Sequence, residues 1–427
     1  MKTLTLKLMK FYPLLIGLFL LIPHAQAAEP LTVEEALSTA LKLNPEVRAA
    51  EAKSDAEFSA IRSQYWIDRP KAGFMYQQDT TLMEVQNGPM TAINVFQDID
   101  FPLKYLFRGS AQQSQAAAAE KEFLLKKLEV RQKVLTGYFN LYSSMKIVSL
   151  LQAQKETIRE IVRIAEARRA TGQVPQQDEM KAHVEQTKIE SDLLLAKQDL
   201  EAAEAMLNAL LNRDAGDPIS FPGKEIQIPK ITVPADTLTT LQLDSSPMIK
   251  REEFMVEQAN TKKGLALLNY FPDMTLWFQK PFHNNMPPNA YSLGIEFSVP
   301  LWFFMKESSD VDVASRLYIE ADKNLEFRRR EVGAEVRSLG ARVRTQAEIL
   351  KIFDTSLIPQ ATTALNSSRG AYQAGEAKFI ELLDSERSLY AVRISFYQTL
   401  TEFVENVTRL EQVVGRSISS LPLGELS

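Results

Sequence analysis

The chain repeats itself at a spacing of about 200 residues, and this duplication constrains the fold more than any other sequence feature. Five pairs of short landmarks recur in the same order along the two halves. The pairs are Asn44-Pro45 with Ser246-Pro247, Pro70 with Pro272, Pro102 with Pro300, Gly172 with Gly375, and Arg213 with Arg416, at offsets of 202, 202, 198, 203 and 203 residues. We therefore predict a first structural repeat over 28–212, a linker over 213–245, a second repeat over 246–416 and a tail over 417–427.

Each repeat is expected to run as helix, two strands, very long helix, glycine-containing tip and returning helix. No proline occurs between Pro102 and Pro175, and Lys104 to Thr171 as one helix of 68 residues would reach about 100 Å. Apolar residues in both returning helices recur with a period of 3.5, which is typical of helices that supercoil against a neighbour and also of an ordinary helical bundle. They are Ile189, Leu193, Ala196, Leu200, Ala203, Leu207 and Leu210, then Phe396, Leu400, Phe403, Val407, Leu410 and Val414. The pattern predicts two helical hairpins with tips near 172 and 375. In the second repeat, Pro359 should break or kink the long helix, because an interior proline removes a hydrogen bond.

Two β-hairpins are predicted at matching places, over 71–101 and 273–299. Apolar and polar residues alternate along them, although Phe96 and Gln97 interrupt the alternation in the first repeat. In a soluble protein such alternation indicates a half-buried sheet, but roughly ten alternating residues per segment are also typical of outer-membrane strands. Two such hairpins in a duplicated, exported chain favour the membrane interpretation. The polar positions, including Ser292, Glu296 and Asp98, would then face a lumen, and Leu293 and Ile295 would face lipid.

Four strands cannot close a barrel, so the open sheet edges must be shared between subunits. Two copies would give eight strands with a filled interior, three would give twelve around an aqueous lumen, and four would give sixteen. The expected fold is therefore mostly helical, with four strands per chain contributed to a membrane β-barrel.

The amino terminus resembles a secretory signal peptide over residues 1–27. Basic residues are followed by the apolar run Phe11–Pro23 and by the cleavage pattern Ala25-Gln26-Ala27. An uncleaved membrane anchor is the alternative.

Composition narrows the possible functions further. The chain has no cysteine, three histidines, and 49 basic against 54 acidic residues, which excludes disulfides and thiol chemistry and argues against nucleic-acid binding. It also lacks a P-loop and a dinucleotide-binding fingerprint. We expect no enzyme activity, no cofactor and no resident metal.

Several stretches resemble the TolC-type outer-membrane efflux proteins, also called outer membrane factors. They are the segment Leu31–Leu37 with Asn44-Pro45, the duplicated strand-to-helix junctions at Pro102 and Pro300, and above all the segment Ala371–Asp384. The resemblance implies a homotrimer with a twelve-stranded barrel in outer-membrane lipid and a helical tunnel, an α-barrel, that crosses the periplasm. It also implies partners, namely a periplasmic adaptor and an inner-membrane efflux pump.

The same resemblance assigns roles to residues near the tips. Glu381 and Asp384 would line a periplasmic aperture, as two rings of three acids that attract cations. Tyr372 and Asp178 would form a latch between neighbouring hairpins. Gly172 and Gly375 would shape the tips at which the adaptor docks. An arginine that completes the latch in the family is replaced here by Ala377.

Two alternatives to these interpretations remain. The acids and glycines of the tips could be only solvated helix residues and helix terminators. The whole chain could be a periplasmic adaptor or another coiled-coil interaction protein, since these also contain long helical hairpins.

The compact mature chain and its short carboxyl end resemble the heavy-metal branch of the family more than the longer drug-efflux branch.

Overall fold

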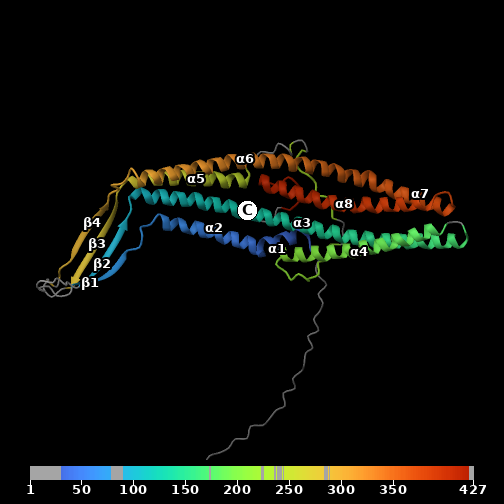
Figure 1. Cartoon of the computed structure of the whole chain (residues 1–427), viewed down its shortest axis with the longest axis horizontal. Coiled ribbons are helices and arrows are strands. Elements are labelled where there is room, and N and C mark those ends of the chain that lie inside the picture. Colours follow the sequence, from blue (N-terminus) through green and yellow to red (C-terminus); the bar gives the residue numbers. More distant parts are fainter. Residues whose placement is uncertain are drawn as a thin grey trace, which may run out of the picture.

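The computed structural model describes residues 30–77, 90–172, 175–222, 226–234, 237, 243, 245–282, 287 and 289–422. The described chain is a long rod with a β-sheet at one end and two helical tips at the other (Figure 1). The predicted signal peptide lies outside the described residues, as does the tail after residue 422.

The first repeat contributes four helices and two strands. The helices are α1 (Val33–Leu43), α2 (Pro45–Gln64), α3 (Pro102–Ala170) and α4 (Gln176–Leu210). Thr32 and Glu35 form a capping box that fixes the start of α1, with each side chain accepting a hydrogen bond from the backbone of the other. The long helix was predicted correctly, because α3 runs unbroken for 69 residues from the sheet to the tip. It ends just before Gly172, whose φ of +72° suits glycine.

The second repeat has the same order with one difference. Its helices are α5 (Pro247–Leu267), α6 (Lys306–Ile352), α7 (Ile358–Ala374) and α8 (Phe379–Val414). A five-residue π-helical turn, Phe353–Leu357, separates α6 from α7. Pro359 follows directly at the start of α7, so the predicted interruption is confirmed. The corresponding place in α3 is Glu156, where the helix continues without a break.

The four strands form one antiparallel sheet in the order β1-β2-β3-β4, with β1 (Lys71–Gln77), β2 (Met90–Ile99), β3 (Asp273–Phe282) and β4 (Ser292–Ser298). The sheet joins the two repeats, since β2 of the first pairs with β3 of the second. Within the described chain, β1 and β4 each have one neighbouring strand, so each leaves one edge open. Both predicted hairpins are confirmed by these strands.

The core lies between helices of the two repeats. The apolar stripes predicted on α4 and α8 face inward, with Leu207, Val407 and Leu410 fully buried, so the period of 3.5 does mark the packed face. No helix among the described residues has the length and apolar character needed to cross a bilayer.

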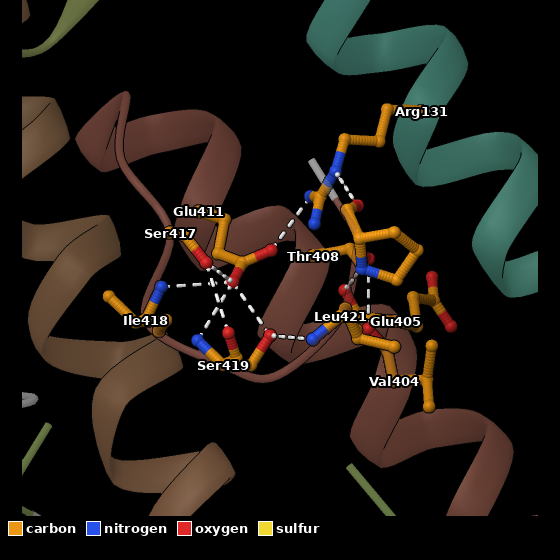
Figure 2. A network of polar contacts seen from close by, with 10 residues as sticks. Arg131, Val404, Glu405, Thr408, Glu411, Ser417, Ile418, Ser419 and Leu421 are labelled. Atoms are coloured by element: carbon orange, nitrogen blue, oxygen red, sulfur yellow. Dashed lines mark hydrogen bonds and ion pairs between the residues drawn. The ribbon is translucent and has the colours of Figure 1, made fainter. Parts of the chain in front are cut away.

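A buried polar network fastens the chain near its described end (Figure 2). Arg131 of α3 donates from Nη1 to Oε2 of Glu411 on α8 across 2.7 Å, and both side chains are 1 % exposed. The other carboxylate oxygen of Glu411 accepts from the backbone N–H groups of Ile418 and Ser419 at 2.9 and 3.0 Å. Arg131 Nε also donates to the carbonyl oxygen of Pro422. This network holds residues 417–422 against the middle of the rod.

Candidate functional site

The end of the rod farthest from the sheet carries the two acids predicted to line an aperture. Glu381 and Asp384 are both exposed, and their spacing of three places them on one side of α8. The opposite side of this helical turn is packed, with Leu382 and Leu383 almost fully buried. The packing fixes the direction in which the two carboxylates point. Whether they form rings depends on further copies of the chain, so that role stays a prediction.

Tyr372 is buried at the same tip, but the hydrogen bond expected to Asp178 is not formed within this chain. The side chain is 1 % exposed, and its hydroxyl has no hydrogen-bond partner among the described residues. Burial raises the pKa of the Tyr372 phenol; the Arg168 charge opposes this and the Asp178 carboxylate adds to it. Asp178 is therefore near enough to act electrostatically, and its role in a latch stays a prediction.

Arg168 of α3 makes the contact between hairpins that the sequence did not reveal. Its Nη1 donates to the carbonyl oxygen of Tyr372 at 2.5 Å, and its guanidinium carbon lies 4.8 Å from the centre of the Tyr372 ring. A Cβ atom added to Gly375 would come within 3.4 Å of this guanidinium. Ala377 stands where the resemblance implies an arginine; within the described chain, Arg168 of the opposite hairpin lies against Tyr372 and Gly375. The basic pair Arg168-Arg169 before the tip was the available signal.

A second contact between the hairpins joins Glu185 of α4 to Arg387 of α8. Arg387 Nε donates to Glu185 Oε1 at 2.9 Å, and the Glu185 side chain is 3 % exposed. The hydrogen bonds from Arg387 hold the pKa of Glu185 below its usual range. Arg387 lies one turn beyond Asp384, so the pair ties α8 to the first hairpin.

Glu386 lies beside this ion pair and is fully buried. Neither of its carboxylate oxygens accepts a hydrogen bond within the described chain. Burial raises its pKa to about 7, and the nearby Glu185 charge adds to this, while Gln154, Arg387 and Lys188 act in the opposite direction. The sequence analysis missed Glu386, although Leu382, Leu383 and Leu389 place it within the buried stripe of α8.

The tip also brings together three side chains of metal-ligand type. Glu166, Glu179 and His183 have ligand atoms within 4.8 Å of one another, and the ring nitrogen Nε2 of His183 lies 3.5 Å from Glu166. Arg169 already binds Glu179 at 2.6 Å. The sequence analysis found no such cluster, because Glu166 lies on the other side of the tip from the i, i+4 pair Glu179 and His183.

At the other end of the rod, the residues predicted to face a lumen do share one face of the sheet. The register aligns Glu296 with Thr275 and Thr275 with Asp98. Thr275 Oγ1 donates to Asp98 Oδ1 at 2.8 Å, which links two strands on this face. Ser292 lies on the same face, two positions along β4 from Gly294. This is the polar face of the sheet, and its exposure to a lumen stays a prediction.

The opposite face is apolar and exposed. Leu293, Ile295, Phe297 and Phe74 are between 57 and 72 % exposed in the single chain. An apolar face of this size calls for a covering by lipid or protein.

The two residues that interrupt the alternation in β2 have local explanations. Phe96 shares the polar face with Trp277, whose ring covers Gly294, where a Cβ atom would lie 2.4 Å from the indole. Gln97 lies on the apolar face, but its amide donates to the carbonyl oxygens of Asp68 and Asp98 at 2.8 Å. Its polar group is therefore satisfied by the backbone.

Comparisons with known proteins agree with this architecture. The family model described as "Outer membrane efflux protein" matches residues 36–213 and again 239–416. The chain is 22 % identical over 391 residues to the cobalt-zinc-cadmium resistance protein CzcC of Cupriavidus metallidurans, covering 92 % of this chain and 91 % of that one. It is 19 % identical to the outer membrane protein TolC of Vibrio cholerae, covering 89 and 90 % of the two chains.

A solved structure shares the fold over nearly the whole chain. The outer membrane protein VceC of Vibrio cholerae superposes with a TM-score of 0.76 at 18 % identity, covering 90 % of this chain and 96 % of that one. At this identity the likeness concerns the fold alone. The two matches of the family model together span well over half of the chain, and the protein belongs to the outer membrane efflux protein family, as a channel-forming component of the Gram-negative outer membrane.

Proposed function

We propose that three copies of this chain form an exit duct through the outer membrane, for substrates delivered by a periplasmic adaptor and an inner-membrane efflux pump. The observation that carries the proposal is the four-stranded sheet, which is open at both edges and apolar on one face. Unpaired edges cannot remain in hydrocarbon, and joining β4 of each copy to β1 of the next removes all of them.

Three copies account best for the two faces of the sheet. Twelve strands give a barrel wide enough for a water-filled lumen, whereas eight strands would fill their interior with side chains. The face bearing Asp98 and Glu296 would line that lumen, and the face bearing Leu293 would meet lipid. Helices of the three copies would continue the lumen as a tube toward the tips.

The tips are the proposed docking end and resting gate. In a trimer, Glu381 and Asp384 would form two acidic rings around the threefold axis, which would attract cations and resist tight closure. Gly172 and Gly375 would let adaptor hairpins approach the backbone closely. The Arg168–Tyr372 and Arg387–Glu185 contacts support a closed resting position, since both join the two hairpins of one chain.

Divalent heavy-metal cations are the proposed cargo class. This rests on the resemblance to a cobalt-zinc-cadmium resistance protein and on the acidic aperture, which suits cations better than anions. Deletion of the gene should raise sensitivity to cobalt, zinc or cadmium salts. Increased sensitivity to hydrophobic dyes alone would instead indicate a drug-efflux duct.

Membrane fractionation tests the duct itself. The purified protein should come from the outer-membrane fraction, require detergent, run as a heat-modifiable trimer, and conduct ions in planar bilayers. Release by osmotic shock as a water-soluble monomer would favour the adaptor interpretation and refute the duct.

A further inference from the structure

Two glutamates of α8 are fully buried, and only one of them has the surroundings that a charged carboxylate needs. Glu411 and Glu386 are 1 % and 0 % exposed. Glu411 accepts hydrogen bonds from Arg131, Ile418 and Ser419 (Figure 2). Glu386 has no such donor, since neither of its carboxylate oxygens accepts a hydrogen bond within the described chain. An ionised carboxylate is costly to bury without donors, so the packed helices favour the neutral, protonated form of Glu386.

The ionisable side chains around this turn of α8 come from α3, α4, α7 and α8, and each is exposed or has a partner. They are Glu185 and Lys188 of α4, Asp384 and Arg387 of α8, the pair Lys155–Glu190 between α3 and α4, the pair Glu160–Arg369 between α3 and α7, and Tyr390, whose hydroxyl is hydrogen-bonded to Thr157. From α3 the neutral amide of Gln154 also faces Glu386. Among these side chains, Glu386 alone is buried without a partner.

A contact between the two hairpins lies directly beside Glu386. Arg387 is the next residue of α8 and donates to both carboxylate oxygens of Glu185 on α4. The Glu185 side chain is only 3 % exposed, so little solvent screens its charge from Glu386. With a proton on Glu386, one buried carboxylate faces one guanidinium. Without that proton, two buried carboxylates compete for the same guanidinium, which weakens the packing of α8 against α4.

We propose that Glu386 is a proton-dependent switch between the two hairpins of one chain. Its protonated form lets α8 pack against α3 and α4, and its ionised form releases this part of α8, because the carboxylate must then reach water or Arg387. Glu381 and Asp384 lie within five residues of Glu386, so the released segment includes both acids. The switch itself needs only one chain, whereas its effect on a duct rests on the proposed function.

Opening of this part of α8 should become easier as the pH rises. Burial and the Glu185 charge raise the pKa of Glu386 to about 7 while the helices are packed, and exposure to water would return it to the ordinary value of 4.5. The equilibrium constant for opening should therefore rise between pH 4.5 and 7 and level off above pH 7. Between pH 5 and pH 8 these two pKa values give a rise of about 70-fold.

Amide hydrogen exchange in detergent measures this opening when each rate is divided by the intrinsic rate at the same pH. The amides of Leu389 and Tyr390, in the turn after Glu386, should lose protection about 70-fold between pH 5 and pH 8. The amides of Phe403 and Val404 are buried in the same helix farther from the tip and should not change. E386Q removes the ionisable group and should keep the protection at both pH values. Equal pH dependence in E386Q and the natural protein, or none in the natural protein, would overturn the proposal.

The position of the pH transition gives a second test. E185Q removes the neighbouring negative charge and frees Arg387, so the transition should move to lower pH. The matched control is E160Q, since Glu160 is 59 % exposed and pairs with Arg369 at 3.6 Å; its transition should stay where it is in the natural protein. If Glu386 only filled space, its surroundings would not set the transition, so an unchanged transition in E185Q would overturn the proposal.

Planar bilayers separate the switch from the duct. The natural channel should open more often at pH 8 than at pH 5, and E386Q should lack the difference. Channel opening that ignores pH, in a protein whose Leu389 protection depends on pH, would overturn the link between the switch and the duct. A protein that forms no channels would refute the proposed function, whereas hydrogen exchange at Leu389 and Tyr390 decides the switch in either case.

Discussion

Replacing Arg131 by methionine should weaken the attachment of residues 417–422 to the rod, and the geometry of the buried network gives the free-energy cost. In the natural protein the guanidinium and the Glu411 carboxylate are 2.7 Å apart and both are 1 % exposed. R131M keeps most of the side-chain volume but leaves one carboxylate oxygen without its partner. Breaking one side of a buried ion pair costs about 3–5 kcal/mol. The lower end applies here, because the other oxygen of Glu411 keeps its donors from Ile418 and Ser419.

Hydrogen exchange of the Ile418 and Ser419 amides is the appropriate assay, since both amides donate to Glu411. If local opening becomes easier by about 3 kcal/mol, their exchange should accelerate about 150-fold. K133M is the matched control on the same helix. Lys133 is 38 % exposed and pairs with Glu129 at 2.8 Å, and a surface pair of this kind contributes only about 0–1 kcal/mol.

The result that would refute this reasoning is specific. If R131M and K133M change the exchange of Ile418 and Ser419 equally, the buried pair does not hold the segment. The variant R131M/E411M, in which both charges are removed, should also be less destabilised than the sum of the two single variants.

Three further predictions concern the helical tips and the sheet. Burial and the Glu185 charge raise the pKa of Glu386 to about 7. The Glu386 carboxyl therefore keeps its proton up to about pH 7 in the folded chain, whereas in the unfolded chain it loses the proton above its ordinary pKa of 4.5. Raising the pH from 5 to 8 should therefore lower the free energy of unfolding by on the order of 3 kcal/mol; urea denaturation of E386Q should lack this dependence, and an equal slope in both would contradict the assignment. E381A/D384A should weaken the block of single-channel current by divalent cations, and an unchanged block would remove these acids from the constriction. L293R should reduce trimer yield, since a charge facing lipid near the midplane costs roughly 2–4 kcal/mol, while S292R should be tolerated; the reverse outcome would mean that the sheet faces are assigned backwards.

Local patterns in the sequence were enough to predict most of the architecture. The absence of proline between Pro102 and Pro175 predicted α3, and Pro359 predicted the interruption before α7. The apolar residues with a period of 3.5 predicted the packed faces of α4 and α8. Each of these features depends on residues a few positions apart. Strand register was harder to predict, because Phe96 and Gln97 disturb the alternation, and only the pairing with Trp277 and the backbone of Asp68 explains them.

The contacts that join distant segments could not be predicted in the same way. Arg131 and Glu411 are 280 residues apart, and nothing in either local sequence indicates that the two charges are buried together. Arg168 contacts Tyr372 of the other hairpin, and this contact becomes visible only when the two tips are side by side. Glu386 is the exception, since its place in an apolar stripe was readable and was overlooked.

The π-helical turn before Pro359 occurs in one hairpin of each chain and not in the other. In a closed ring of copies, helical hairpins with this turn would therefore alternate with hairpins whose long helix is unbroken. If all hairpins were alike, the tube could narrow only if all of them tilted together. In the proposed trimer, the three hairpins without the turn would keep their positions while the three hairpins with the turn move inward.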